Sequence, residues 1–296
     1  MRNGIRQGQR RLIIPFLAPA AILFGLFILY PAVKTGYLAF TGWRGVTNAQ
    51  PWVGAANFRE LWHDSIARHA LTITIKYTLV GGALLFPIAM YFAVATSHGR
   101  FGARTYRFIL LAPLSMSVVT AAILWKFIFN PTFGPLNAAL GLVGLHSLER
   151  PWLGDTSTAL LCVIIATIWH GLGQWVVLIG ASLSRVPPEL REAAIIDGAH
   201  DRQVFTRITL PLIWETTRAL LVLWVIAGLQ SFAFVWSMTQ GGPLNATEVL
   251  ATYIYRTGFI DYQYGYAAAA AVFTVALIGA IALVLNRIMR REAVRF

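Results

Sequence analysis

Charged side chains are scarce in this sequence. Lys, Arg, Asp and Glu together make up 12% of its 296 residues, whereas hydrophobic residues make up 57%. A soluble domain usually carries about 25% charged residues, so this composition excludes an ordinary water-soluble enzyme. Cysteine is almost absent as well, because Cys162 stands alone within an apolar stretch. An internal disulfide is therefore excluded.

Three further absences narrow the chemistry. No GxxxxGK[ST] loop occurs, so we expect no nucleotide site in this chain. No group of His and Cys residues has metal-ligand spacing, and no set of catalytic side chains is visible, so we expect neither a metal, nor another cofactor, nor an enzyme. No acidic residue lies in the middle of an apolar run. This argues against a carrier driven by protons or sodium, which needs a carboxylate within the membrane.

What the sequence does contain is long apolar runs. A helix needs about 20 apolar residues to cross the hydrocarbon core of a bilayer. Six runs meet this length once flanking residues are included, and we predict an all-α, polytopic membrane protein with one transmembrane domain over residues 1–296. The predicted spans are residues 12–40, 70–97, 105–129, 156–184, 211–240 and 264–289.

Basic residues are distributed unevenly between the two sides that six spans would define. An even number of spans places both termini on one side. Sixteen of the 24 Lys and Arg residues fall on that side, in the tails and in two loops. The positive-inside rule then predicts cytoplasmic termini in a multi-pass protein of the cell membrane. The net charge of +12 accordingly reports topology, and we expect no nucleic-acid partner.

The loop between the fourth and fifth spans, residues 185–211, differs from its surroundings. Pro187 and Pro188 suit a helix start, and Glu189 follows in the first turn, where the helix dipole favours a carboxylate. Gly198 suits a C-terminal cap, and Asp201 suits the N-cap of the next helix. The pattern predicts a helix of about ten residues, roughly 15 Å long. Periodicity alone leaves two roles open: a helix that docks into a partner protein, or a connector on the membrane surface.

The same loop carries a recognisable motif. The order Glu192-Ala193-Ala194, three residues, Gly198, nine residues, Ile208, one residue, Leu210-Pro211 resembles the EAA signature of ABC importer permeases at every position. The resemblance implies that this helix couples the permease to a cytoplasmic ATPase. Glu192, Ala193, Ala194 and Gly198 would then shape the ATPase interface, and Ile208, Leu210 and Pro211 would fix the return into the membrane.

Two other segments agree with this resemblance. The first span, with its Tyr30-Pro31 step and its exit at Phe40-Thr41-Gly42-Trp43, is similar to that of maltose-type sugar permeases. So are MTQGGPLNATEVLATYIYRTGF and GYAAAAAVF near the end of the chain. The resemblance implies a second homologous permease, a cytoplasmic ATPase dimer that binds ATP and Mg²⁺, and an extracellular solute-binding protein. The extra N-terminal spans and large outer loop of the maltose subunit have no counterpart here.

A sugar is usually held by aromatic faces together with hydrogen-bonding groups. The fourth predicted span, 156–184, and the fifth, 211–240, offer both kinds of group. We take them as candidate walls of a substrate pathway, with two span-four glycines, Gly171 and Gly173, loosening or crowding the helix. The candidates are Trp169, His170, Gln174, Gln230, Phe232, Phe234 and Trp236.

The sequence therefore favours a permease that imports a sugar or oligosaccharide. One alternative is the same machinery importing another organic solute, such as glycerol 3-phosphate. A phosphate ester would favour an Arg or Lys within the pathway, and the middle of the spans offers none. A second alternative is a stand-alone secondary carrier, which the missing mid-span carboxylate argues against.

Overall fold

A computed structural model describes residues 16–45, 49–97 and 103–289 of the chain. The described part is helical, apart from one isolated bridge between Thr41 and Trp52. Four of its helices are long and apolar enough to cross a membrane. The number rises to six if each of two sharply bent helix pairs is one span. The chain divides into two compact units, residues 1–64 with 254–275 and residues 65–253 with 276–296.

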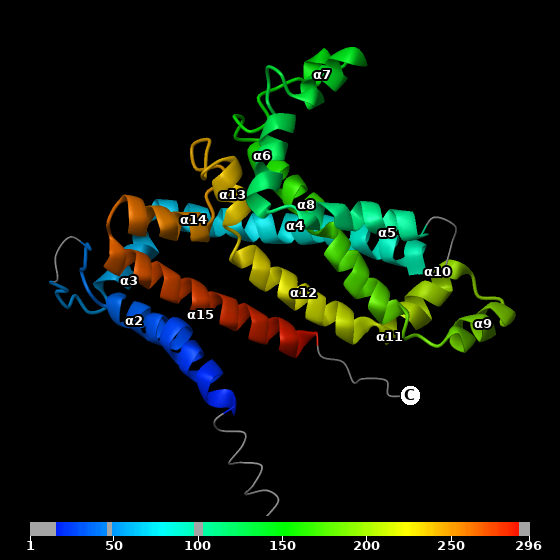
Figure 1. The fold of residues 1–296 in the computed structure, drawn as a ribbon, viewed down its shortest axis with the longest axis horizontal. Helices are drawn as coiled ribbons and strands as arrows, with labels where there is room; N and C mark the ends of the chain where they lie inside the picture. Colours follow the sequence, from blue (N-terminus) through cyan, green and yellow to red (C-terminus); the bar gives the residue numbers. More distant parts are fainter. Residues whose placement is uncertain (1–15, 46–48, 98–102, 290–296) are drawn as a thin grey trace, which may run out of the picture. The chain divides into compact units, whose positions relative to one another are not determined.

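The first unit contains the N-terminal helix and the start of the last one (Figure 1). Its helices are Phe16–Leu38, which includes a π-turn η1 (Gly25–Leu29) and α2 (Tyr30–Leu38), then α3 (Ala56–His63), the π-turn η5 (Arg256–Ile260) and the first half of α15 (Tyr264–Ile288). Asn57 joins them, because its side-chain amide donates to the carbonyls of Ala39 and Thr41, each at 2.9 Å. Gly265 permits a close approach, since a Cβ there would collide with the Thr41 carbonyl.

The second unit holds the remaining helices. They are α4 (Ser65–Ser97), α5 (Ala103–Leu111), the 3₁₀ turn η2 (Ala112–Ser115), α6 (Val118–Ile128), α7 (Pro135–Leu142), the 3₁₀ turn η3 (His146–Leu148), α8 (Ala159–Leu183), α9 (Pro188–Ile196), α10 (Asp201–Val204), the π-turn η4 (Phe205–Thr209), α11 (Leu210–Leu212), α12 (Trp214–Leu229), α13 (Ala233–Met238) and α14 (Leu250–Tyr255), which runs on into the first unit. Helix α4 packs along α8 and α12 (Figure 1).

Small residues let α4 and α12 approach closely. Gly81 and Gly82 lie against the indole of Trp224, and a Cβ on either glycine would come within 2.7 Å of that ring. A short-range contact between helix backbones is how membrane helices gain packing energy where water provides no driving force. Buried residues of α4, α6, α8, α12 and α13 form one continuous core around this contact.

The predicted third span, 105–129, is not a single straight helix. Two pieces, Phe108–Ser115 and Val118–Ile128, meet at an angle of 106°. Pro113 lies in the 3₁₀ turn before the break, and Ser117 starts the second piece by accepting the backbone N–H of Thr120 at 3.1 Å. Pro and an N-cap Ser each favour a helix boundary, which explains why an apolar run without charges still breaks.

The predicted fifth span, 211–240, is also divided. Helix α12 ends at Leu229, the chain departs from helical geometry at Gln230, and α13 begins at Ala233. At its other end, α12 meets Asp201–Leu212 at an angle of 72°. The predicted span therefore contains more than one helix, because a run of apolar residues indicates burial in lipid or protein and does not require a straight helix.

The other predicted spans agree more closely with the described helices. Helix α8 matches 156–184 within three residues, and α15 matches 264–289 within one. Helix α4 begins five residues before the predicted 70. Residues 12–15 of the first span lie outside the described residues. So do eight of the sixteen arginines that carried the topology argument, namely Arg2, Arg6, Arg10, Arg11, Arg100, Arg290, Arg291 and Arg295.

Candidate functional site

The loop that carries the motif folds as a short helix, α9. Pro187 is its N-cap, Pro188 its first residue, and Glu189 lies in the first turn. The helix contains nine residues, so the predicted element of about ten is confirmed. Pro fits this position because its missing N–H would be unpaired there in any case.

Gly198 ends α9 in a defined way. Its φ is +84°, in the left-handed region. Its N–H donates to the carbonyl of Ile195 at 3.0 Å, and the N–H of Ala199 donates to the carbonyl of Ala194 at 2.9 Å. These two bonds form a Schellman motif, which satisfies carbonyls that a helix end leaves open. A Cβ at Gly198 would meet no other atom within 4 Å, so the motif glycine is required by its backbone conformation and not by crowding.

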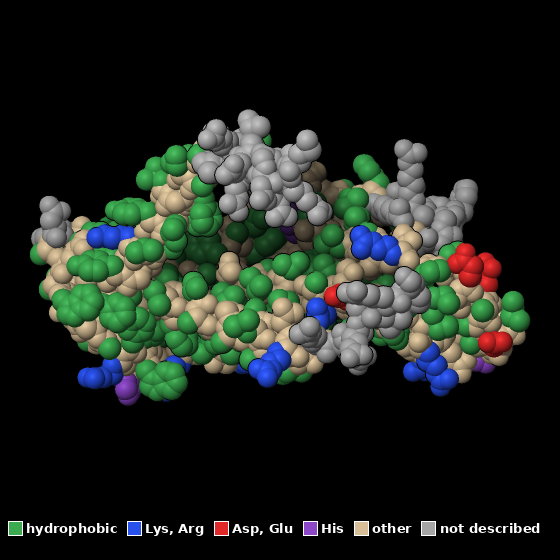
Figure 2. All heavy atoms as spheres, turned by 90° about the horizontal axis from the view of Figure 1, so that it is seen from below, with side chains coloured by type: hydrophobic (Ala, Val, Ile, Leu, Met, Phe, Trp, Pro, Cys, Tyr) green, Lys and Arg blue, Asp and Glu red, His purple; other side chains and the backbone are tan. Residues whose placement is uncertain are grey.

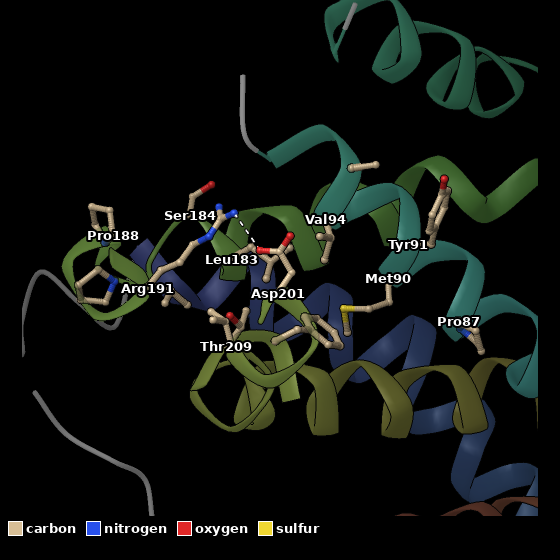
Figure 3. A pocket seen from close by; sticks show the side chains of 15 residues that line it. Pro87, Met90, Tyr91, Val94, Leu183, Ser184, Pro188, Arg191, Asp201 and Thr209 are labelled. Carbon is tan, nitrogen blue, oxygen red and sulfur yellow. Dashed lines mark ion pairs between the residues drawn. The ribbon is translucent and has the colours of Figure 1, made fainter. Parts of the chain in front are cut away.

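The prediction that Asp201 is an N-cap was wrong by one residue. His200 occupies that position, and its backbone N–H donates to the side-chain oxygen of Gln203 at 3.0 Å. Asp201 is the first residue of α10 and lies 3.7 Å from the guanidinium of Arg191 on α9 (Figure 3). Both side chains are accessible to solvent, so this ion pair adds at most about 1 kcal/mol and chiefly sets the angle between the two helices.

The last motif residues lie where the chain turns back toward α12. Ile208 is within the π-turn η4, and Leu210 and Pro211 begin α11. The N–H of Leu210 donates to the carbonyl of Phe205, five residues earlier. Pro211 has no N–H to continue the ladder, and a π-turn immediately before it accommodates the missing bond. The 72° bend follows directly, at Ile213.

The outward side of α9 is apolar at its tip. Ile196 is 85% exposed and Ile195 is 48% exposed, while Glu192 and Ala193 are also exposed and Ala194 is partly buried. Most acidic side chains visible in Figure 2 gather over the end of this unit that carries α9 and α10. Two isoleucines exposed beside carboxylates on a nine-residue helix form a surface suited to docking. The motif prediction missed both isoleucines, although their place one turn after Glu192 signals a shared exposed end.

A cavity of about 770 Å³ lies behind α9. One wall comes from α4, with Met90, Tyr91 and Val94, and the opposite wall comes from α9, α10 and η4 (Figure 3). Arg191 and Asp201 lie at this cavity and pair there. The cavity separates α9 from the long helix α4, so α9 is attached to the unit mainly through its two ends.

A second cavity, of about 360 Å³, lies among the predicted spans. Three of the seven predicted pathway residues line it: His170, Gln174 and Phe234. The His170 and Phe234 rings meet edge to face at 5.5 Å. None of the described residues that line this cavity carries a formal charge. Aromatic rings, an amide and an imidazole in an uncharged wall can hold a neutral polyhydroxylated ligand.

The other four predicted pathway residues do not line this cavity. Trp169 packs edge to face against Trp125 at 5.7 Å, and Phe232 stacks on Trp236 at 5.7 Å. Gln230 is exposed just beyond the end of α12. A residue's span does not determine its face, so composition could not separate these side chains from the three that line the cavity.

Prediction also missed several lining residues, including Thr167, Trp175 and Trp224. Thr167 shares one face of α8 with His170, Gly171 and Gln174, at spacings of three and four residues. This helical spacing of small and polar side chains was the signal that could have identified it. Thr167 accepts the phenol O–H of Tyr77 on α4 at 2.9 Å.

Of the two effects predicted for the span-four glycines, loosening of the helix is not seen and close packing is, at Gly173. Helix α8 is continuous through Gly171 and Gly173. Gly173 instead admits the break of the third span, because a Cβ there would collide with the carbonyl of Leu110. One turn away, His170 contacts the carbonyl of Met116 through Nε2 at 3.2 Å. A carbonyl only accepts, so Nε2 carries the proton. This hydrogen bond holds Met116 at the point where the third span bends.

Comparison with known proteins places this arrangement in one family. The family model described as "Binding-protein-dependent transport system inner membrane component" matches residues 85–294. The permease protein MsmF of a multiple sugar-binding transport system from Streptococcus mutans is 29% identical over 93% of this chain and 94% of its own length. The sn-glycerol-3-phosphate transport system permease protein UgpA from Agrobacterium fabrum is 31% identical over 91% and 92%.

A solved structure agrees over the whole length. A bacterial ABC transporter involved in the import of the acidic polysaccharide alginate has a chain that superposes with a TM-score of 0.86, at 26% identity, over 99% of both chains. The matched region contains α9 and both cavities. The chain belongs to the family of inner-membrane components of binding-protein-dependent ABC transport systems.

Proposed function

We propose that this chain is a membrane-spanning permease subunit of an ATP-driven importer for a sugar or oligosaccharide. The observation that carries the proposal is α9, a short helix with exposed Ile195 and Ile196 that is held at its ends, closed by the motif glycine and followed by a sharp bend. Such a helix presents a docking surface, and its movement would pass into α12 through α10, η4 and α11, which follow it in the chain after the turn at Gly198.

The complete assembly would contain this permease, a second homologous permease, a cytoplasmic ATPase dimer and an extracellular solute-binding protein. ATP and Mg²⁺ would be bound by the ATPase. Closure of the ATPase dimer would move α9, and the helices would alternate between outward- and inward-facing states. We assign six spans, with each bent pair counted as one, and cytoplasmic termini in a multi-pass protein of the cell membrane. The basic residues of the loops support this orientation.

The second cavity is the proposed place where solute passes this subunit. His170 and Gln174 offer hydrogen bonds and Phe234 offers an aromatic face. The uncharged wall favours a neutral solute, whereas a phosphate ester would gain from an Arg or Lys. Glycerol 3-phosphate remains the second candidate, because the UgpA relative carries that name. The ligand of the cognate binding protein, found by screening sugars and phosphate esters in calorimetry, decides between the two.

The docking role is tested by co-purifying the chain with its ATPase. Glu192→Lys and Ile196→Glu should each reduce the amount of ATPase retained and the ATP hydrolysis stimulated by the loaded binding protein. Glu60→Lys is a charge-matched control, because Glu60 is an exposed carboxylate far from the loop in sequence, on α3. Retention equal to wild type in both loop variants would show that α9 does not bind the ATPase.

A further inference from the structure

A stretch that begins in the last turn of α6 and runs toward α8 is unusual for a chain segment that lies mostly outside a span. Residues 127–148, here called the α7 segment, contain no Asp, Glu, Lys or Arg. A water-exposed segment of this length would be expected to carry about five charges, at the usual 25%. Charged residues flank it directly, Lys126 before and Glu149 after. The composition of the α7 segment is therefore that of a membrane-embedded stretch, although helix α7, at eight residues, extends only about 12 Å and cannot cross a bilayer.

Six large apolar side chains of the α7 segment are exposed, while Phe129 and Leu136 pack into the core. Leu142 is 89% exposed and Val143 is 68% exposed. The segment thus presents a nearly continuous apolar surface, which is rare on a surface that faces water. Its other exposed large hydrophobic residues are Phe127, Phe133, Leu145 and Leu148.

The two asparagines of the segment form hydrogen bonds within the protein. Asn137 is buried, and its amide donates to the carbonyls of Pro131 and Arg150 at 3.3 and 3.2 Å. Its oxygen accepts the indole N–H of Trp152 at 2.6 Å. Asn130 accepts the backbone N–H groups of Thr132 and Phe133. Thr132, His146 and Ser147 are exposed, so the segment combines internally paired asparagines with a few polar groups at its surface. This mixture suits the interfacial layer of a bilayer, where a buried asparagine without partners would be costly and exposed polar groups can reach water.

The apolar surface continues from α6. Phe127, near the end of α6, contacts the ring of Phe133 with centroids 5.6 Å apart, so the exposed side of α6 extends into the α7 segment. At the other end, the guanidinium of Arg150 lies 5.7 Å from the ring of Trp152. Trp and Arg are the residues that mark a membrane–water interface. Lipid against α6 would thus meet the α7 segment before it reaches this polar boundary.

We propose that the α7 segment lies in the interfacial layer of the bilayer, with Leu142 and Val143 inserted among the lipids, and is not a loop in water. The segment anchors the bent third span, since α6 leads directly into it. Figure 1 shows α7 extending beyond the helices of its unit, where it has few neighbours to cover it. This inference concerns contact with lipid and does not rest on which solute is transported.

A matched pair of leucines tests the proposal. Leu244, in the loop between α13 and α14, is 90% exposed, and the topology proposed above places it on the same side of the membrane. In a Cys162→Ala background, which removes the one native cysteine, nitroxide labels are attached to Leu142→Cys, Val143→Cys or Leu244→Cys. The assembled transporter is studied in lipid nanodiscs without binding protein. Collision with oxygen, which concentrates in lipid, is compared with collision with a water-soluble nickel chelate.

Labels at 142 and 143 should collide more with oxygen than with the chelate, whereas the label at 244 should show the reverse. Equal chelate accessibility at 142, 143 and 244 would overturn the proposal in favour of an aqueous loop. Labels at 142 and 143 shielded from both reagents would also overturn it, because a partner chain would then cover the segment. ATP hydrolysis of each labelled transporter confirms that the assembly is intact.

Discussion

The indole N–H of Trp224 on α12 donates to the backbone carbonyl of Thr78 on α4, at a distance of 2.9 Å. Both residues are buried. The indole also fills the space left by Gly81 and Gly82, one turn further along α4. Trp224 also lines the second cavity. This contact therefore fixes α12 against α4 at the wall of the proposed solute pathway.

Gly82→Ala should destabilise the protein. Its Cβ would lie 2.7 Å from Nε1 of Trp224, and overpacking of this kind costs about 1–3 kcal/mol. The melting temperature of the purified transporter, measured by the loss of its monodisperse peak after heating, should fall.

Gly180→Ala on α8 is the matched control, because a Cβ there meets nothing within 4 Å. An unchanged melting temperature in Gly82→Ala would mean that α4 and α12 are further apart than this contact requires.

Substitutions at Gly198 should follow the conformational demand of its positive φ. Gly198→Ala forces an L-residue into the left-handed region at a cost of about 1–2 kcal/mol. If the cost appears in the docked state, ATPase binding weakens by about five- to thirtyfold. Gly198→Asn should be milder, because Asn tolerates this region. Titration of the purified ATPase against the permease in nanodiscs measures the affinity of each variant, which should decrease in the order Gly, Asn, Ala at position 198. Alanine binding as well as glycine would contradict the Schellman end of α9.

His170→Leu should weaken the bent third span. The variant removes the donor to the Met116 carbonyl, and one such hydrogen bond contributes about 0.5–1.5 kcal/mol. For a protein of this size each kcal/mol corresponds to about 2–4 °C in melting temperature. His170→Gln keeps a donor on a side chain of similar length, so it should lose less. Equal melting temperatures for the two variants would show that the hydrogen bond does not stabilise the break.

A comparison of two glutamines tests whether the second cavity is the solute pathway. Gln174 lines the second cavity, whereas Gln230 lies outside it. Gln174→Ala should raise the KM for transport of the solute by about two- to tenfold, the value of one lost hydrogen bond of about 0.5–1.5 kcal/mol. Gln230→Ala should transport as wild type does.

Uptake into proteoliposomes with saturating binding protein measures both variants. An effect at Gln230 without one at Gln174 would place the pathway elsewhere.

The bounds of α9 were predictable in detail because they are set by residues next to one another in the sequence. A Pro-Pro start, a carboxylate in the first turn and a glycine at the end each act through the backbone within a few residues. The structure accordingly has α9 at Pro188–Ile196 with Gly198 at positive φ. The predicted N-cap, Asp201, was wrong by one residue. The observed N-cap is His200, whose backbone N–H donates to the side chain of Gln203, and His is a less common N-cap residue than Asp.

The pathway was less predictable because it depends on which face of each helix turns inward. Gln174 and Gln230 are chemically identical, and nothing in their own spans distinguishes them. Only the packing of α4, α8 and α12 places one in the cavity wall and leaves the other outside. The same holds for Gly173, whose role appears only where the broken third span crosses α8.

By itself the sequence determined that this chain is a helical membrane protein, where its apolar runs lie and where helix α9 begins and ends. Those properties follow from residue-by-residue transfer to lipid and from short-range backbone bonding. Tertiary structure decided that two of the runs are bent, that Trp224 meets Thr78, and that three of seven predicted residues share a cavity. These features depend on contacts between residues far apart in sequence, whose geometry no local pattern records.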